Sequence, residues 1–462
     1  MSTKHSIAAT KFLQNKKQEE WQDETLWQVR EKRDRMSKQL PEWEQLRDMA
    51  RDIKLYSNSH LHELLQEFEQ HALANGAIVH WAKDAEEFNR TVYDILHSHQ
   101  VKRFIKSKSM LAEECELNPF LISKGIEVVE SDLGERILQL MNLPPSHIVL
   151  PAIHIKREQV GALFEEKMGT EKGNSDPTYL THAARKDLRN KFIHAQAAMT
   201  GVNFAVASTG EVVVCTNEGN ADMGTSQPTL QIAGMGLEKI VPNRESLGVF
   251  TRLLARSATG QPITTYTSHY RKPRKGGEFH IIIVDNGRSD ILAKPEHIKT
   301  LNCIRCGACM NTCPVYRRSG GYSYTYFIPG PIGINLGMLK SEQKYFDNVS
   351  ACSLCHSCSF VCPAKVDLAE QIYLWRQDLL RIGRANKTKK AMSDGMQYLM
   401  ERPKLFNSAV RMAPIANHLP HFMKYNHLNT WGEGRELPEF SNESFNEMWK
   451  KNKLTSKADH DE

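Results

Sequence analysis

Four cysteines lie within eleven residues in the segment CIRCGACMNTCP, which covers residues 303–314. The segment CSLCHSCSFVCP, residues 352–363, repeats this spacing, and a proline follows the last cysteine of each run. The pattern C-x2-C-x2-C-x3-C-P is typical of ferredoxins with two [4Fe–4S] clusters, in which the fourth cysteine of each run binds the other cluster. Zinc is the alternative, but zinc sites usually take two C-x2-C pairs separated by a longer loop. We therefore predict two [4Fe–4S] clusters, which transfer single electrons.

The spacing predicts crossed ligand sets. The first set comprises Cys303, Cys306, Cys309 and Cys362, and the second comprises Cys352, Cys355, Cys358 and Cys313. Gly307 allows the backbone to approach the first cluster closely, whereas His356 at the equivalent position predicts a different local environment for the second. The isolated Cys115 and Cys215 are interpreted as buried structural thiols.

The elements around the two runs are expected to be helical. Residues 296–385 contain little β-type sequence, and LAEQIYLWRQDLLRIG after the second run has the pattern of an amphipathic helix. The 38 residues between Cys313 and Cys352 are rich in glycine, proline and tyrosine. We expect a helical ferredoxin module with a large inserted loop there, which could cover the clusters or meet a partner.

An α/β domain precedes this module. Between residues 77 and 168, short apolar runs such as AIVHWA, VKRFIKS, IEVVES and HIVLPA alternate with helical stretches. This alternation predicts βαβ units and a parallel-rich sheet with flanking helices. A helix is expected at about 178–198, followed by two strands joined at Thr209-Gly210 and further strands in LQIAGM, PITTYTS and EFHIIIVDNG.

The whole chain is expected to have four parts. These are an N-terminal helical segment (1–70), the α/β domain (71–295), a helical ferredoxin-like domain with the two clusters (296–390) and an extended or helical tail (391–462). The amphipathic helices of the first part are expected to pack against a later domain, and the tail is expected to wrap the rest irregularly.

Composition restricts the class of protein. The 60 basic and 54 acidic residues give a formal charge of only +6, which does not by itself indicate nucleic acid. The basic run 381–390 lacks interleaved aromatic residues and is interpreted first as a solvated helix end, then as a docking site for an acidic partner. No stretch suits a transmembrane segment or a secretion signal, so a cytoplasmic protein is expected.

The chain resembles a known family along nearly its whole length, the lactate-utilisation protein B family of iron–sulfur proteins. The resemblance rests on both cysteine runs and on residues 106–140, 145–154, 199–220 and 435–450, the last of which read RELPEFSNESFNEMWK. It implies that the α/β domain has the fold of sugar-phosphate isomerases and CoA transferases. It also implies a three-protein complex that oxidises L-lactate to pyruvate, in which this chain relays electrons to an unknown acceptor. The implied partners are a cysteine-rich subunit and a small α/β subunit.

Five residues outside the cysteine runs are candidates for binding a ligand. Lys106, Lys108 and Ser109 in KSKSM could receive an anion such as a carboxylate where a strand meets a helix, although Ser109 could simply cap that helix. Glu218 occupies a position similar to the nucleophilic glutamate of CoA transferases, but a hydrogen-bonded turn residue is favoured. Glu211 follows the Thr209-Gly210 turn, near which loops of this fold border a ligand cleft.

No catalytic residue is identified, and two other functions stay open. The chain could be an α/β enzyme that acts on a carboxylic acid or thioester, with accessory clusters. It could also be an interaction protein whose cysteines only bind a metal that stabilises its fold. His147 and His154 bracket IVLPAI and are interpreted as structural.

Overall fold

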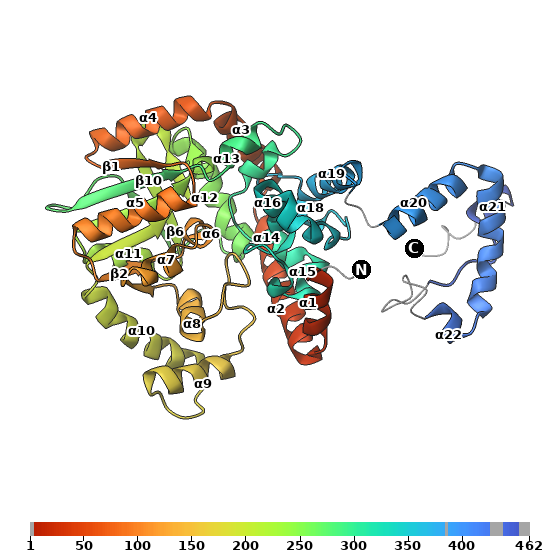
Figure 1. Cartoon of the computed structure of the whole chain (residues 1–462), viewed down its shortest axis with the longest axis horizontal. Helices are drawn as coiled ribbons and strands as arrows, with labels where there is room; N and C mark the ends of the chain where they lie inside the picture. The colour runs from red at the N-terminus through yellow and green to blue at the C-terminus, as the bar shows by residue number, and fades with distance from the viewer. Residues whose placement is uncertain (1–3, 384–386, 426–437, 452–462) are drawn as a thin grey trace. The chain divides into compact units, whose positions relative to one another are not determined.

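The computed structural model describes residues 4–383, 387–425 and 438–451 of the chain (Figure 1). The chain divides into two compact units, a core unit of Ser2–Asp378 and a C-terminal unit that comprises Leu379–Glu462. All ten cysteines belong to the core unit.

A six-stranded sheet lies at the centre of the α/β part of the core unit, with the strand order β1-β10-β7-β4-β2-β3. Its strands are β1 (Ile78–Ala82), β2 (Arg103–Lys106), β3 (Glu127–Glu130), β4 (Ala197–Gly201), β7 (Leu230–Gly236) and β10 (Glu278–Val284). Every neighbouring pair is parallel. The predicted parallel-rich sheet with flanking helices is therefore confirmed.

Alternate side chains of these strands sort to opposite faces of the sheet, as the period of two in a strand requires. Phe104 and Ile282 pack on one side in a cluster with the helices α5 to α7, whereas Ile281 and Ile283 pack on the other side with α4. Figure 1 shows α4 and α5 on opposite sides of β1 and β10. The flanking helices are α4 (Leu61–Ala74), α5 (Ala85–Ser98), α6 (Met110–Glu114), α7 (Leu117–Ser123), α8 (Leu133–Met141), α9 (Arg157–Met168) and α10 (Pro177–Ile193).

A second, four-stranded sheet has the order β8-β5-β6-β9. Its strands are β5 (Phe204–Val206), β6 (Glu211–Thr216), β8 (Ile240–Val241) and β9 (Tyr266–Tyr270). The antiparallel pair β5–β6 turns at Thr209-Gly210, where Gly210 has φ +66° and packs so closely on α4 that a Cβ would lie 2.3 Å from the Ala72 nitrogen. Near these strands lie η1 (Ala207–Thr209), α11 (Asn220–Ser226), η2 (Leu237–Lys239), α12 (Arg244–Ala258) and α13 (Arg288–Leu292).

One sequence prediction in this domain places the end of a helix too late, and another is wrong. The helix expected at 178–198 ends at Ile193, and β4 follows it as an inner strand of the large sheet. The run HIVLPA forms no strand but a loop, in which His147 Nδ1 accepts hydrogen bonds from the backbone N–H groups of Val149 and Leu150, both at 3.0 Å. Local hydrogen bonds to a side chain replace the ladder of a sheet there.

The cysteine-bearing part is helical, as predicted, but its insertion is not a loop. Residues 314–350 form α15 (Pro314–Ser319), η4 (Gly321–Ser323), α16 (Gly330–Lys340), α17 (Glu342–Tyr345) and η5 (Phe346–Ser350). Most of α16 is buried, including Ile332, Ile334 and Met338, so this helix supplies core. The other elements are η3 (Ile298–Asn302), α14 (Ala308–Thr312), α18 (Ser357–Val361) and α19 (Leu368–Arg381).

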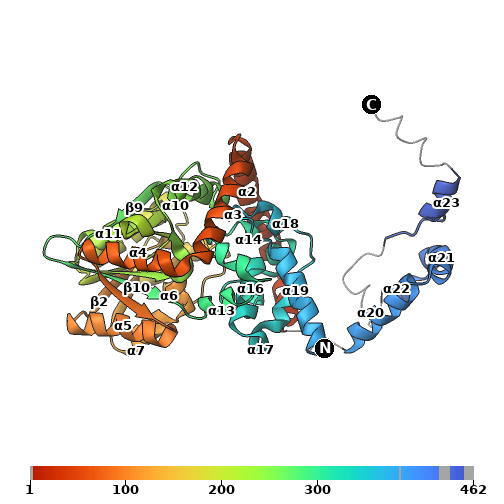
Figure 2. The same cartoon turned by 90° about the horizontal axis from the view of Figure 1, so that it is seen from above.

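The N-terminal helices pack against this part of the molecule. They are α1 (Lys4–Leu13), α2 (Lys16–Lys38) and α3 (Trp43–Ser59), and α2 lies beside α14 (Figure 2). Two buried arginines reach the end of the second cysteine run. Arg33 donates to the Val361 carbonyl at 3.0 Å, and Arg47 donates to the carbonyls of Cys362 at 3.0 Å and Phe360 at 2.7 Å.

The C-terminal unit is helical where the structure describes it, with α20 (Lys387–Met400), α21 (Pro403–Met412), η6 (Ala413–His418), α22 (His421–Lys424) and α23 (Phe445–Lys450). The helices from α21 onward contain no buried residue in the described segments. Residues 384–386 of the predicted basic run lie outside the described residues. Within the described ranges, no helix has the length and apolar character that a membrane crossing needs.

Candidate metal centre and the adjoining cavity

The eight clustered thiols are close together in two groups of four. Burial raises the pKa of Cys306, and the nearby Cys362 and Cys303 raise it further. Burial likewise raises the pKa of Cys313 to about 12, and there the nearby thiols are Cys352 and Cys355. The fourth cysteine of each run is therefore a neighbour of the other run.

The remaining thiols fit the same division. Cys309 has Cys303, Cys306 and Cys362 of its own group as neighbours and also lies near Cys358, where the two groups adjoin, whereas Cys358 has Cys313, Cys352 and Cys355. All eight are free of disulfides. Four thiols gathered in one place are stabilised in their anionic form only by a positive partner, and soft thiolates select iron–sulfur clusters or zinc. This donor set fits one metal centre in each group.

The two runs share one backbone geometry. Arg305 and Leu354, with φ of 59° and 55°, donate their N–H groups to Cys303 Sγ at 3.4 Å and Cys352 Sγ at 3.3 Å. His356 has φ 59° and adopts the left-handed conformation of Gly307. The backbone is therefore the same at the two positions, and only their surroundings differ. At Gly307 the His147 ring packs so closely that a Cβ would lie 3.0 Å from it.

The two groups differ in exposure. Three thiols of the first group are buried and Cys303 is partly buried, whereas Cys355 of the second group is exposed and Cys352 is partly exposed. Phe360, between Cys358 and Cys362 in the chain, is 68% exposed. The second group therefore lies at the surface and the first lies inside the core unit.

The loop at 144–155 joins the α/β domain to the first cysteine run. His147 Nε2 donates to Asn311 Oδ1 at 2.9 Å, and burial lowers the pKa of His147 to about 3, so the ring is neutral. His154 bonds to Tyr322 Oη at 2.8 Å, and burial lowers its pKa to about 4. Both histidines hold the loop against the helical module.

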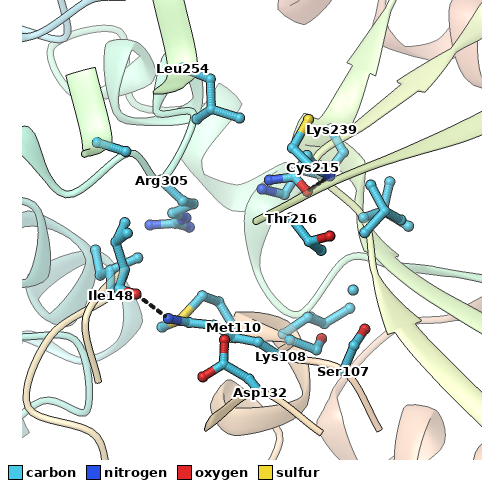
Figure 3. A pocket seen from close by; sticks show the side chains of 18 of the residues that line it. Ser107, Lys108, Met110, Asp132, Ile148, Cys215, Thr216, Lys239, Leu254 and Arg305 are labelled. Carbon is cyan, nitrogen blue, oxygen red and sulfur yellow. Dashed lines mark hydrogen bonds between the residues drawn. The ribbon is translucent and has the colours of Figure 1, made fainter. Parts of the chain in front are cut away.

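A cavity of about 290 Å³ lies between the α/β domain and the first cysteine run. Residues that follow the carboxyl ends of β2, β3, β4, β7 and β10 line it, which is where open parallel sheets bind ligands. From the helical module, Arg305 and Ile328 complete its wall. Figure 3 shows Arg305, Lys239 and Lys108 around the same space, with apolar side chains such as Leu254 and Ile148 between them.

Three of the five predicted ligand residues line this cavity, namely Lys108, Ser109 and Glu218. Lys108 Nζ donates to the Val149 carbonyl at 3.0 Å. Ser109 accepts from the Ala112 N–H at 3.2 Å and so also caps α6. Glu218 accepts from the Leu133 N–H at 3.1 Å, and burial together with the Asp132 carboxylate raises the pKa of Glu218 to about 7.

The other two predicted residues do not line the cavity. Lys106 is fully buried, with its ammonium 2.8 Å from Glu130 Oε1 and 3.4 Å from Glu113 Oε1. Glu211 is buried and receives two hydrogen bonds from Arg244, at 2.8 and 2.7 Å. Both are held in ion pairs within the fold.

Sequence reasoning missed a group of charged residues at the inner end of the cavity. Arg288 donates to Glu114 Oε2 at 2.8 Å and to Glu238 Oε2 at 2.5 Å, and Lys239 and Arg305 lie close by. Burial opposes ionisation of Glu238, but these three cations lower its pKa on balance. It also missed the place of Cys215, which is partly buried and lines the cavity. Among these residues only Arg305 could have been noticed in the sequence, because it is a cation that lies between two predicted cluster ligands, Cys303 and Cys306.

An α/β domain joined to a helical module with two groups of four thiols defines a class of iron–sulfur protein, and comparison with known proteins agrees. The model of the LUD domain matches residues 65–291, and that of the 4Fe-4S dicluster domain matches residues 299–366. The chain belongs to the lactate utilisation protein B family, as its resemblance predicted.

The relatives align with nearly the whole chain. Lactate utilization protein B of Bacillus cytotoxicus is 40% identical over 429 residues, which cover 90% of each chain. The "Uncharacterized electron transport protein YkgF" of Escherichia coli K12 is 39% identical over 439 residues, which cover 92% of each. A crystal structure of a DUF162 family protein from Deinococcus radiodurans is 15% identical, with a TM-score of 0.28, and covers 48% of this chain and 98% of that one.

Proposed function

We propose that this chain is the electron-transfer subunit of a complex that oxidises L-lactate to pyruvate. It relays single electrons through two [4Fe–4S] clusters. The observation that carries this proposal is the gathering of eight thiols into two groups of four within one compact unit. The names of the relatives, a lactate utilization protein and an electron transport protein, support the substrate and the kind of reaction.

In this proposal the first cluster is held by Cys303, Cys306, Cys309 and Cys362, and the second by Cys352, Cys355, Cys358 and Cys313. A [4Fe–4S] cluster supplies one-electron oxidation and reduction when it is bound. The protein supplies N–H donors to the sulfurs, such as those of Arg305 and Val366, which stabilise negative charge there. The apolar Ile304 and Val361, both buried, limit the access of water to the first set.

The difference in exposure indicates a direction for the relay. The first thiol group adjoins the cavity through Arg305, and the second reaches the surface at Cys355. We expect electrons to enter on the buried side and to leave at the exposed side, toward another subunit or an acceptor. The partners in this proposal are the cysteine-rich subunit and the small α/β subunit of the complex.

Metal analysis of the anaerobically purified protein tests the cofactor. Two [4Fe–4S] clusters correspond to about eight irons and eight sulfides per chain, and reduction by dithionite should give the EPR signal of two interacting clusters. One or two zinc ions in place of the iron would contradict the proposal and would favour an interaction protein.

Reduction by L-lactate tests the function. The clusters should become reduced when lactate is added together with the two partner subunits, and should stay oxidised without them. Reduction of the isolated chain by lactate would contradict the relay and would identify the chain as an enzyme in its own right, an alternative that the cavity keeps open.

A further inference from the structure

We propose that the cavity beside the first cysteine run binds a small hydroxycarboxylic acid, with the carboxylate of the acid between Arg305 and Lys239. The site follows from the geometry of the cavity, whereas the identity of the acid as lactate rests on the proposed function. The proposal therefore places a binding site for the substrate class in this subunit next to its first redox centre.

Arg305 is the first observation. Its side chain is only 11% exposed, and its Nη2 lies 3.7 Å from Glu238 Oε1, which is beyond a hydrogen bond. Arg305 lines the cavity, and a carboxylate placed there would accept from the guanidinium nitrogens that face it. Because the contact with Glu238 is longer than a hydrogen bond, the guanidinium can pair with such an anion at the cavity wall.

The charges around Arg305 are the second observation. Arg288 is already shared between the carboxylates of Glu114 and Glu238. Lys239 and the buried Lys54 add two more cations beside Glu238, so these groups and Arg305 carry four positive charges against two negative ones. The first cluster with its thiolates would face these cations from one side of Arg305, and an anion in the cavity would face Arg305 and Lys239 from the other.

Lys239 points to the same ligand. Burial lowers its pKa, which the neighbouring Glu238 partly opposes. The structure gives its ammonium no hydrogen bond among the described residues, although it lines the cavity. A bound carboxylate would supply both the hydrogen bond and the opposite charge.

The rest of the cavity fits the remainder of a hydroxy acid. Leu254, Ala258 and Ile148 form apolar walls that suit a short carbon chain. Figure 3 shows Asp132 at another side of the lining, and Glu218, which also lines the cavity, lies near it. Both could accept a hydrogen bond from a hydroxyl group. These two acids would repel a second negative charge, so the site favours a monocarboxylate over phosphate.

Occupancy of this site should influence the first cluster. Arg305 stands between Cys303 and Cys306 in the chain and donates its own N–H to Cys303 Sγ. A bound anion would neutralise the positive charge that stabilises added electrons there. We expect the acid to lower the reduction potential of the first cluster more than that of the second.

Calorimetric titration of the full-length, iron-loaded protein under anaerobic conditions tests the site. L-lactate, pyruvate and inorganic phosphate serve as the probes. L-lactate should bind, and pyruvate, which has no hydroxyl group to donate to Asp132 or Glu218, should bind more weakly. Arg305→Gln and Lys239→Gln should each weaken lactate binding by at least about tenfold, the loss of one charged hydrogen bond. Lys275→Gln, at an exposed lysine outside the cavity, is the matched control and should bind like the parent.

Redox titration followed by EPR supplies a second readout that needs no variant. The acid should lower the potential of one of the two cluster signals more than that of the other. Absence of acid binding to protein with full iron content, or equal binding of phosphate, would overturn the proposal. The proposal would also be overturned if Arg305→Gln and Lys239→Gln changed the reduction potential of the first cluster but bound the acid normally. The two cations would then only balance the charge of the cluster.

The same experiments separate this inference from the proposed function. A protein that accepts electrons in the lactate-dependent complex but binds no acid keeps its function and lacks the site. A protein that binds the acid but is never reduced in the complex has the site and lacks the relay.

Discussion

At the scale of single residues, the crossed arrangement of the cysteines can be tested through the fourth cysteine of each run. Cys313 has its thiol neighbours in the second run, and Cys362 has Cys303 of the first. In Cys313→Ala, we expect the damaged cluster to be the one held by Cys352, so the remaining EPR spectrum should match that of Cys352→Ala. Cys362→Ala should match Cys303→Ala in the same way. A match between Cys313→Ala and Cys303→Ala would show that each run binds its own cluster.

Glu135 gives a prediction for the dependence of stability on pH. Burial, together with the charges of Glu130 and Glu113, raises the pKa of this carboxyl group to about 8, against the opposing charge of Lys108. The folded protein therefore keeps the proton to about pH 8, whereas the unfolded chain releases it near 4.5. The free energy of unfolding should fall as the pH rises through this window, by at most about 1.4 kcal/mol per pH unit.

The variant Glu135→Gln should remove this loss, because the amide is neutral at every pH and can donate to the neighbouring carboxylates. Its melting temperature relative to the parent should rise between about pH 5 and pH 8, the window set by the two pKa values. Glu127→Gln, at an exposed glutamate of β3, is the control and should show no such trend. A constant difference between Glu135→Gln and the parent across this range would contradict the prediction.

The residues of the site could be predicted only where they share a local pattern. The cysteine spacing identified the eight thiols because the loops around each cluster are short. Lys239 and Arg305 lie far apart in the chain, and only the packing of the α/β domain on the helical module brings them to one cavity. The same packing leaves Glu211 out, since Arg244 and His269 occupy its carboxylate.

At the scale of elements, α3 braces the end of the second cysteine run. Arg47 is 5% exposed and binds the carbonyls of Cys362 and Phe360. Arg47→Gln leaves buried carbonyls without these donors, which typically costs about 1–3 kcal/mol. We expect the first cluster to be lost faster when an iron chelator is added anaerobically, as measured by the decay of its visible absorbance.

Arg51 lies one helical turn further along α3 and provides the matched control. Its guanidinium pairs with Asp48 and Asp52, and within the described chain it makes no hydrogen bond or ion pair with either cysteine run. Arg51→Gln should lose iron at the parental rate. Equal rates for Arg47→Gln and the parent would mean that α3 only covers the module and does not hold Cys362 in place.

Elements with strong local patterns were predicted well, and those set by tertiary contacts were not. The strands β7 and β10 are apolar runs bounded by turn residues, as the sequence indicated. The strand β4, Ala-Ala-Met-Thr-Gly, has little β-propensity, and its pairing between β2 and β7 determines its conformation. The insertion at 314–350 looks like a loop because of its glycines, but Gly333 and Gly337 permit close packing of α16, where a Cβ would lie 1.7 and 3.2 Å from neighbouring atoms.

At the scale of the whole molecule, the division into two units predicts that the metal centres do not need the C-terminal unit. The core unit contains all eight clustered cysteines and every residue of the cavity. The described helices of the C-terminal unit expose large apolar side chains instead, among them Met396, Met412, Phe445 and Trp449. Exposed apolar side chains in such number are typical of a surface that binds another protein.

A chain that ends at residue 383, just after α19, should therefore keep its iron content, its EPR spectrum and its melting temperature. It should lose affinity for the partner subunits by at least about tenfold, because burial of several large apolar side chains contributes more than about 1.4 kcal/mol to association. Iron analysis and a pull-down with the purified partner subunits measure the two effects separately. Loss of iron from the shortened chain would mean that the C-terminal unit takes part in holding the clusters, and unchanged partner affinity would place the docking surface on the core unit, where Cys355 and Phe360 are exposed.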